Sequence, residues 1–291
     1  MRLCRFAEDR VGLVRGDEIF DVTAVLADLR YPYPLPRFDP LMADLGLLRP
    51  AIERAADRAV GQPIASTGLL SPVANPGKII AAPVNYKKHL EEARADAAIH
   101  HQKQIEEIQR VGLFLKATSS VVGPSEGVAI RHAERRTDHE IELAAVIGRP
   151  ADRVSARNAL DCVAGYCIGL DITVRGPEER SLRKSIDTYT VLGPWLVTSD
   201  ELSDPSNLDL SLAVNGEIRQ SANTRDLIIG VAELIAYASS FYTLMPGDVL
   251  LTGTPEGVAP IQAGDVMRAA IARIGAMDIG VRAADAAPYD G

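Results

Sequence analysis

The stretch Thr137–Gly148, TDHEIELAAVIG, places two carboxylates at the start of an apolar, strand-forming run. Side chains alternate between the two faces of a strand, so Glu140 and Glu142 share one face, while His139 and Ile141 take the other. Two neighbouring carboxylates on a half-buried strand repel each other and resist desolvation, and a cation between them removes both costs. Taken alone, the pattern also suits a solvated edge strand with two exposed glutamates.

A third carboxylate lies in the next strand-like segment, VAGYCIGLDITVRG at residues 163–176. Asp171 interrupts an otherwise apolar run, and a buried carboxylate needs a cation, a positive side chain or several N–H donors. Arg175 has the same parity as Asp171, so one alternative is an ion pair that only closes the strand. Glu140, Glu142 and Asp171 together offer three hard oxygen ligands, which suit Mg²⁺ or Mn²⁺ better than zinc.

Residues 87–110 contain no proline or glycine and are rich in Ala, Glu, Gln, Lys and Arg. This composition predicts a helix, and its weak apolar stripe favours a helix that lies over an opening. His89 and Glu92 are three residues apart, so they are neighbours on one helix face. A histidine oriented by a carboxylate is the usual arrangement of a general base, although spacing alone suits a solvated surface pair equally.

Length and charge limit the remaining possibilities. The chain of 291 residues accommodates a small N-terminal domain, residues 1–72, and a larger domain, residues 73–291. A net charge of −8 does not favour binding to nucleic acid or to an anionic membrane. No apolar run approaches the roughly 20 residues that cross a bilayer, and the charged N-terminus does not resemble a signal peptide. We expect the three cysteines to be reduced and buried, as in a cytoplasmic protein.

The motifs form a series in chain order: NY–H-x-x-E, FLK, D-x-E-x-EL–VIG, GY–D-x-T-x-R, KS-x-D, LGPW, NGE–RQ and PGD-x-x-x-TGTPEGV. This series resembles the fumarylacetoacetate hydrolase family from roughly Lys78 to Val281, about 70% of the chain. The resemblance implies an α+β, mainly β fold. Its parts are a mixed β-roll, a small N-terminal α/β domain and a helical lid at about residues 87–110. It also implies a homodimer with one Mg²⁺ or Mn²⁺ per subunit.

The resemblance also assigns roles to individual residues. The family's metal ligands correspond to Glu140, Glu142 and Asp171. Its catalytic residues correspond to His89, Glu92 and Lys184. Residues of the substrate pocket correspond to Tyr86, Lys116, Arg175, Glu178 and Thr254.

The chain departs from the family pattern after Arg175, where Gly176-Pro177-Glu178 replaces the common D-x-Q. A glutamate in place of the glutamine loses two donors and adds negative charge, so Glu178 is a candidate specificity residue.

The implied activity is hydrolysis of a C–C bond in a 1,3-dicarbonyl acid during aromatic-compound catabolism. The substrate is a small anionic acylpyruvate, such as fumarylpyruvate or maleylpyruvate, and the products are pyruvate and a carboxylic acid. In this reading His89 positions a water molecule, Glu92 stabilises the imidazolium, and Lys184 stabilises the enolate. The alternative is an oxaloacetate decarboxylase or a 2-hydroxy-dienedioate isomerase/decarboxylase that uses the same site. A third class is a non-catalytic, metal-bound relic or binding protein. Retention of all six residues that correspond to the family's metal ligands and catalytic residues argues against it, because a relic has no physical need for three clustered carboxylates.

Overall fold

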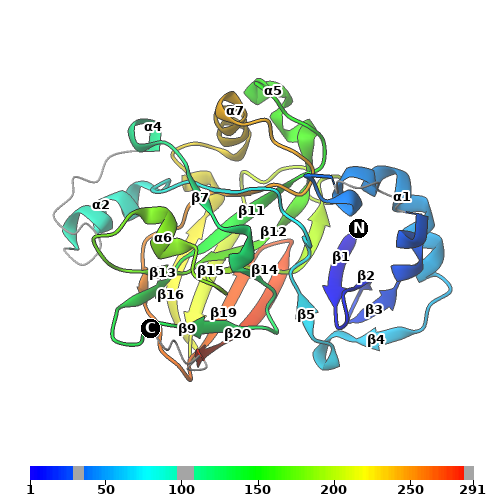
Figure 1. The fold of residues 1–291 in the computed structure, drawn as a ribbon, viewed down its shortest axis with the longest axis horizontal. Helices are drawn as coiled ribbons and strands as arrows, with labels where there is room; N and C mark the ends of the chain where they lie inside the picture. The colour runs from blue at the N-terminus through cyan, green and yellow to red at the C-terminus, as the bar shows by residue number, and fades with distance from the viewer. Residues whose placement is uncertain (29–35, 97–107, 285–291) are drawn as a thin grey trace.

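The computed structural model describes residues 1–28, 36–96 and 108–284. β-strands dominate these ranges, and the helices lie around the sheets (Figure 1). The mainly β, mixed-sheet class predicted from the sequence is therefore confirmed.

The strands are β1 (Arg2–Phe6), β2 (Arg10–Arg15), β3 (Glu18–Asp21), β4 (Gly61–Pro63), β5 (Leu69–Leu70), β6 (Ile79–Ala81), β7 (Phe114–Lys116), β8 (Val121–Val122), β9 (Val128–Ile130), β10 (Thr137–His139), β11 (Ile141–Ile147), β12 (Val163–Asp171), β13 (Thr173–Val174), β14 (Thr190–Thr198), β15 (Asp209–Val214), β16 (Glu217–Asn223), β17 (Val249–Leu251), β18 (Ala259–Pro260), β19 (Val266–Ile271) and β20 (Gly275–Ala283). The α-helices are α1 (Pro40–Ala56), α2 (Lys87–Ala95), α4 (Ile108–Val111), α5 (Ala156–Ala159), α6 (Arg180–Lys184) and α7 (Val231–Phe241). Short 3₁₀ turns are η1 (Thr23–Asp28), η2 (Ile64–Ser66), η3 (Thr118–Ser120), η4 (Leu160–Cys162) and η5 (Thr224–Asp226).

β11 lies inside a sheet of 12 strands with the order β4-β3-β2-β1-β14-β12-β11-β17-β6-β7, to which β5 and β8 are added. Every residue of β11 is buried. Leu143 and Ala145 pack into one hydrophobic cluster, while Ala144 and Val146 pack into another. A strand covered on both faces reads as a continuous apolar run, which explains the sequence after Glu142.

Two smaller sheets complete the roll. One has the order β16-β15-β19-β20-β9 and the other β13-β10-β18. The hairpin between β15 and β16 turns at Asn215 and Gly216, with φ of 51° and 83°, as an Asn-Gly turn requires. β10 and β11 belong to different sheets and are separated by Glu140 alone. Glu140 therefore sits where the chain passes from one sheet to the next.

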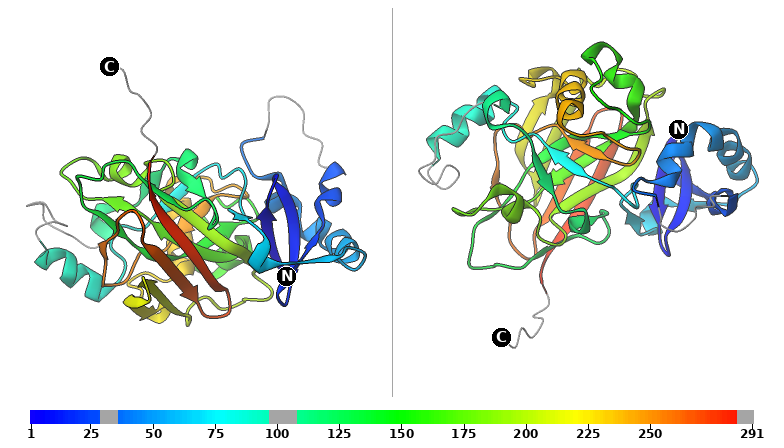
Figure 2. Two further views of the ribbon diagram at one scale, coloured as in Figure 1. Left: turned by 90° about the horizontal axis from the view of Figure 1, so that it is seen from below. Right: turned by 45° about the horizontal axis from the view of Figure 1, so that its top comes forward.

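The N-terminal elements gather at one end of the molecule, opposite the end where α2 lies (Figures 1 and 2). α1 begins after Asp39, whose side chain accepts a hydrogen bond of 3.1 Å from Met42 N. β1 pairs with β14, with Arg2 opposite Val197, so the N-terminal strands extend the main sheet. The domain boundary near residue 72 stays a prediction.

The predicted helix at residues 87–110 is shorter in the structure. α2 ends at Ala95, because Asp96 is extended (φ −92°, ψ 107°) and its carboxylate contacts Arg136 at 3.1 Å. Residues 97–107 lie outside the described ranges, and α4 follows as a single turn. The prediction of one continuous helix over residues 87–110 was therefore wrong. The contact between Asp96 and Arg136 outweighs the high helix propensity of the local sequence.

Two further expectations concern the whole chain. All three cysteines are free and buried, as predicted. Within the described ranges, no helix is long and apolar enough to cross a membrane.

Candidate metal centre and active site

Glu140, Glu142 and Asp171 form one buried cluster. Each offers an oxygen, and these oxygens lie within 4.8 Å of one another. The antiparallel register of β11 and β12 brings them together, since Glu142 lies opposite Gly169 and Asp171 N donates to Glu140 O at 2.9 Å. Strand parity had placed the two glutamates on one face, and their convergence on Asp171 agrees with it.

Two lysines enter this cluster. Lys184 Nζ lies 2.7 Å from an oxygen of Glu140 and 2.7 Å from an oxygen of Asp171, and it donates to Thr173 Oγ1 at 2.6 Å. The side chain of Lys116 is fully buried, and its Nζ donates a hydrogen bond to the other carboxylate oxygen of Asp171. Burial lowers the pKa of Lys116, and the charge of Asp171 opposes that shift. Each carboxylate oxygen of Asp171 therefore has a lysine ammonium as its partner.

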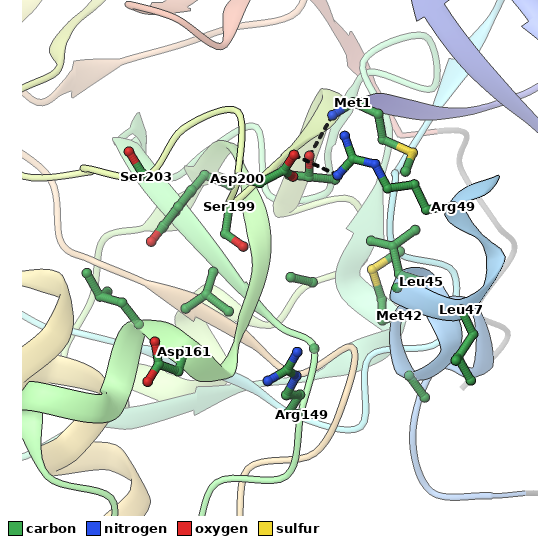
Figure 3. Close-up of a pocket in the computed structure, with 18 residues that line it drawn as sticks. Met1, Met42, Leu45, Leu47, Arg49, Arg149, Asp161, Ser199, Asp200 and Ser203 are labelled. Carbon is green, nitrogen blue, oxygen red and sulfur yellow. Dashed lines mark hydrogen bonds and ion pairs between the residues drawn. The ribbon is translucent and has the colours of Figure 1, made fainter. Parts of the chain in front are cut away.

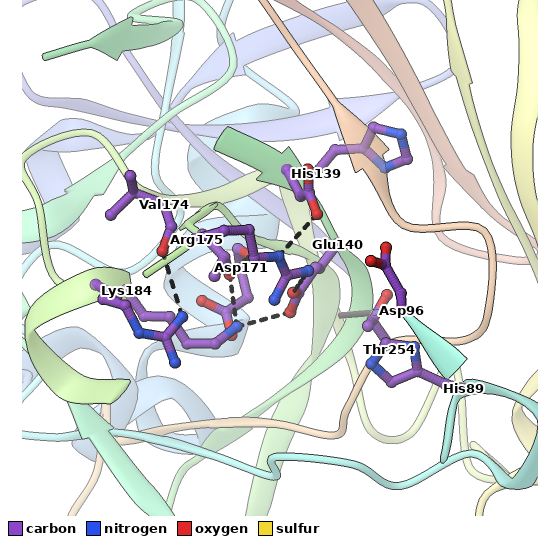
Figure 4. A network of polar contacts seen from close by, with 12 residues as sticks. His89, Asp96, His139, Glu140, Asp171, Val174, Arg175, Lys184 and Thr254 are labelled. Carbon is purple, nitrogen blue, oxygen red and sulfur yellow. Dashed lines mark hydrogen bonds and ion pairs between the residues drawn. The ribbon is translucent and has the colours of Figure 1, made fainter. Parts of the chain in front are cut away.

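Arg175 does not pair with Asp171, so the simple strand-closing ion pair was wrong. Its Nε donates to Asp138 Oδ2 at 2.7 Å, and its Nη2 donates to Glu140 Oε1 at 2.9 Å. Burial opposes the charge of Arg175, but Glu140 and Asp138 raise its pKa. The sequence reasoning missed Asp138, although it has the parity of Glu140 and Glu142. Figure 4 shows this network, with His89 and Thr254 beyond Glu140.

Glu142 is the carboxylate that the network leaves without a cation. It makes no ion pair with any described residue, and Gly253 N donates to its Oε2 at 2.6 Å. Burial and the charges of Asp171 and Glu140 raise the pKa of Glu142 well above its usual value. Burial acts the same way on Glu140, but Lys184 and Arg175 hold its pKa well below the usual range. A divalent cation among these oxygens would supply the missing positive charge, so the residues fit Mg²⁺ or Mn²⁺.

His89 and Glu92 project from α2 as a connected pair. His89 Nδ1 lies 2.9 Å from Glu92 Oε2, and Glu92 Oε1 accepts a hydrogen bond of 2.9 Å from Gly257 N. An ionised carboxylate only accepts, so Nδ1 carries the proton and a neutral His89 keeps its Nε2 lone pair free. Glu92 therefore orients the imidazole and ties α2 to the loop after β17.

Thr254 lies in that loop and is fully buried. Gln220 Nε2 donates to Thr254 Oγ1 at 2.8 Å and to Pro255 O at 2.9 Å. Gln220 Oε1 accepts from Ile141 N at 3.1 Å and contacts His139 Nδ1 at 3.0 Å. The two backbone partners fix which end of the amide is which. The His139 ring points away from Glu140, as strand parity predicts, and contacts Gln220 (Figure 4). Gln220 is a candidate site residue that the sequence showed only as part of a motif.

Tyr86 and Glu178 occupy different surroundings. The Tyr86 hydroxyl is buried without a hydrogen-bond partner among the described residues. Glu178 is half-buried and pairs with Arg135 at 2.8 Å. A Cβ at Gly176 would lie 1.9 Å from Arg135 Nη2, so the glycine leaves room for that pair. Gly176 and Glu178, which both depart from the family pattern, are therefore sterically linked through Arg135. A substrate contact of either Tyr86 or Glu178 stays a prediction.

A pocket of about 860 Å³ lies elsewhere, between α1 and the ends of β12 and β14 (Figure 3). It is lined by Met42, Arg149 and Asp161, and by an Arg49–Asp200 ion pair of 2.6 Å. None of the clustered carboxylates lines it. We place the chemistry at the carboxylates because titratable groups of opposite charge converge there in a buried setting.

Residues 78–282 match the model of the fumarylacetoacetate (FAA) hydrolase C-terminal family. The chain belongs to this family, as the mixed roll and the carboxylate cluster indicate. It is 58% identical to maleylpyruvate hydrolase of Aquipseudomonas alcaligenes, over 97% of this chain and 99% of that protein. It is 38% identical to the mitochondrial oxaloacetate tautomerase fahd2 of Xenopus laevis, over 72% of this chain and 66% of that protein. Maleylpyruvate hydrolase from Sphingobium sp. SYK-6, solved with manganese(II) and pyruvate, matches with a TM-score of 0.83 and 40% identity, over 98% of this chain and all of that one.

Proposed function

We propose that the chain is a divalent-metal-dependent hydrolase that cleaves the C–C bond of an acylpyruvate. Maleylpyruvate is the first candidate substrate, and the products are pyruvate and a carboxylic acid from aromatic-compound catabolism. The observation that carries the proposal is the oriented His89–Glu92 pair, tied over a buried cluster of three carboxylates. The likeness to the two maleylpyruvate hydrolases supports the substrate.

The carboxylates of Glu140, Glu142 and Asp171 would hold the cation. A bound Mg²⁺ or Mn²⁺ would supply Lewis-acid stabilisation of the negative charge that develops on substrate oxygens. The proton transfers fall to the protein side chains.

His89 Nε2 takes a proton from the attacking water, and the charge of Glu92 stabilises the imidazolium that results. The water oxygen bonds to the distal carbonyl carbon, and the bond from that carbon to the pyruvate methylene then breaks. The electron pair of this bond becomes the enolate of pyruvate, and the proton on the His89 imidazolium returns to the methylene carbon of the enolate, which leaves pyruvate and neutral His89. Attachment of Glu92 to Gly257 keeps α2 over the site and limits access of other water.

Thr254 and Lys184 bind the anionic ends of the reaction. Because Gln220 donates to Thr254 Oγ1, the Thr254 hydroxyl proton is free to be donated to the substrate carboxylate. Lys184 Nζ lies between two carboxylates and stabilises the negative charge that develops on the enolate oxygen.

The test is turnover of acetylpyruvate, maleylpyruvate, fumarylpyruvate and oxaloacetate with Mg²⁺ or Mn²⁺ and after EDTA. Loss of enol absorbance and release of pyruvate are followed, in water enriched in ¹⁸O. We expect metal-dependent cleavage of an acylpyruvate with one ¹⁸O in the acid product. Pyruvate from oxaloacetate alone, without ¹⁸O incorporation, would overturn the hydrolase assignment.

The second candidate is chemistry on oxaloacetate or a 2-hydroxy-dienedioate at the same site, without water as a reactant. The likeness to an oxaloacetate tautomerase favours it, and the same carboxylates and Lys184 would stabilise an enolate there. It adds no water to the substrate, so its products would carry no ¹⁸O in the test above, whereas hydrolysis places one ¹⁸O in the acid product.

The proposal includes a homodimer in the cytoplasm. Three buried free cysteines suit a reducing compartment. Light scattering on the purified chain checks the dimer, and fractionation of the source cells checks the compartment.

A further inference from the structure

Arg180, at the start of α6, differs from the other cations near the carboxylates. Its guanidinium makes no hydrogen bond and no ion pair with any residue that the structure describes. Lys184 and Arg175 each contact two carboxylates instead. On the same helix, Arg183 donates to two backbone carbonyl oxygens, at 3.0 and 3.3 Å.

The helix places Arg180 beside the site. Residues four apart share a helix face, so Arg180 and Lys184 project together, about 6 Å apart along the axis. Arg180 Cζ and Lys184 Nζ each lie 5.5 Å from the ring centroid of Phe114, which is buried on β7. Lys184 Nζ contacts Glu140 and Asp171, so Arg180 lies one helical turn from a residue that contacts the carboxylate cluster, and the charges of both carboxylates act on it.

The surroundings of Arg180 favour an anion. Burial lowers the pKa of Arg180, and the charges of Glu179, Glu140 and Asp171 oppose that shift. The guanidinium remains charged in any case. The Phe114 ring is the contact of this guanidinium that the structure shows, and a partly buried charge without an anionic partner is unfavourable. The planar fork of an arginine binds a carboxylate through two parallel hydrogen bonds.

We propose that Arg180 binds the second carboxylate of the substrate, so that the site selects acylpyruvates whose acyl group ends in a carboxylate. This inference rests on the proposed function, which places the pyruvate half at the carboxylate cluster. The acyl chain would then extend from Lys184 towards the start of α6. A monocarboxylic substrate such as acetylpyruvate leaves Arg180 without a partner.

The test compares Arg180→Met with the unaltered enzyme on maleylpyruvate and acetylpyruvate. We expect kcat/KM for maleylpyruvate to fall about 10- to 100-fold, mainly through KM, which is the loss of one charge-assisted bidentate contact. We expect acetylpyruvate cleavage to stay within about twofold, since it makes no such contact. Arg180→Lys keeps the charge without the fork and should recover part of the maleylpyruvate activity.

Arg157→Met is the matched control. Arg157 is exposed on α5, and this substitution removes the same positive charge as Arg180→Met. An equal loss on both substrates in Arg180→Met would overturn the assignment and mark Arg180 as a residue that only supports α6. Unchanged kinetics on both would overturn it while leaving the hydrolase intact. If the unaltered enzyme cleaves neither acylpyruvate, the proposed function fails and the assignment fails with it.

Discussion

Gln220 donates a hydrogen bond of 2.8 Å to the hydroxyl of Thr254, although the two residues are 34 positions apart in the chain. The oxygen of the Gln220 side-chain amide accepts a hydrogen bond from the backbone N–H of Ile141, next to Glu140, which we propose as a metal ligand. One fully buried amide therefore joins the start of β11 to the loop that we propose binds the substrate carboxylate.

This relationship predicts that Gln220→Glu impairs substrate binding more than metal binding. A glutamate side chain cannot donate the hydrogen bonds that Gln220 donates to Thr254 Oγ1 and Pro255 O. Its negative charge would lie against these two oxygens instead. We expect kcat/KM to fall about 10- to 100-fold, while Mn²⁺ affinity measured by calorimetry changes little. Gln262→Glu, at an exposed position, is the matched control. Unaltered kinetics in Gln220→Glu would rule out this role.

His89→Ala should remove the general base and leave the metal ligands in place. We expect kcat to fall by about 10²- to 10⁴-fold, with Mn²⁺ affinity retained. Glu92→Gln still accepts from Gly257 N but does not stabilise the imidazolium by charge, so its loss should be smaller. His132→Ala is the control, since His132 is half-exposed beside Glu134. Equal activity of His89→Ala and the unaltered enzyme would refute the assignment of the base.

Glu142→Gln should change stability in opposite directions with and without metal. Without metal, the substitution removes a buried carboxylate that lacks a cation, so we expect stability to increase by about 1 kcal/mol. With Mn²⁺ at 100 times its Kd, the unaltered protein should gain about 2.7 kcal/mol, and the variant should gain much less.

Thermal unfolding in EDTA and in Mn²⁺ at one pH measures both effects. Glu217→Gln, which alters an exposed glutamate paired with Arg219, serves as the control. An equal Mn²⁺-induced rise in Tm for Glu142→Gln and the unaltered protein would exclude Glu142 as a ligand.

Gly216→Ala tests the hairpin that connects β15 and β16. Gly216 has φ of 83°, and nothing lies within 4 Å of a Cβ there, so strain is the only penalty. We expect a loss of about 1 kcal/mol in the free energy of unfolding, measured with urea. Gly280→Ala in β20 also meets open space but has no positive φ, so it should be neutral or slightly stabilising. Identical midpoints for the two variants would show that the turn tolerates alanine.

The sequence by itself determined which side chains share a face of a strand. Alternation along one strand is a local property, so Glu140 and Glu142 could be separated from His139 before any fold was known. Asp171 could be added because a carboxylate in an apolar run demands compensation. The mainly β class and the Asn215-Gly216 turn follow from equally local patterns.

Only the tertiary structure decided which cation meets which carboxylate. Lys116 and Asp171 are 55 positions apart, and Arg175 and Asp138 are 37 apart, so their pairing depends on how distant strands align. The end of α2 at Ala95 likewise depends on the contact of Asp96 with Arg136. The face on which each side chain lies follows from its position in its own strand. The register between strands depends on packing over the whole sheet.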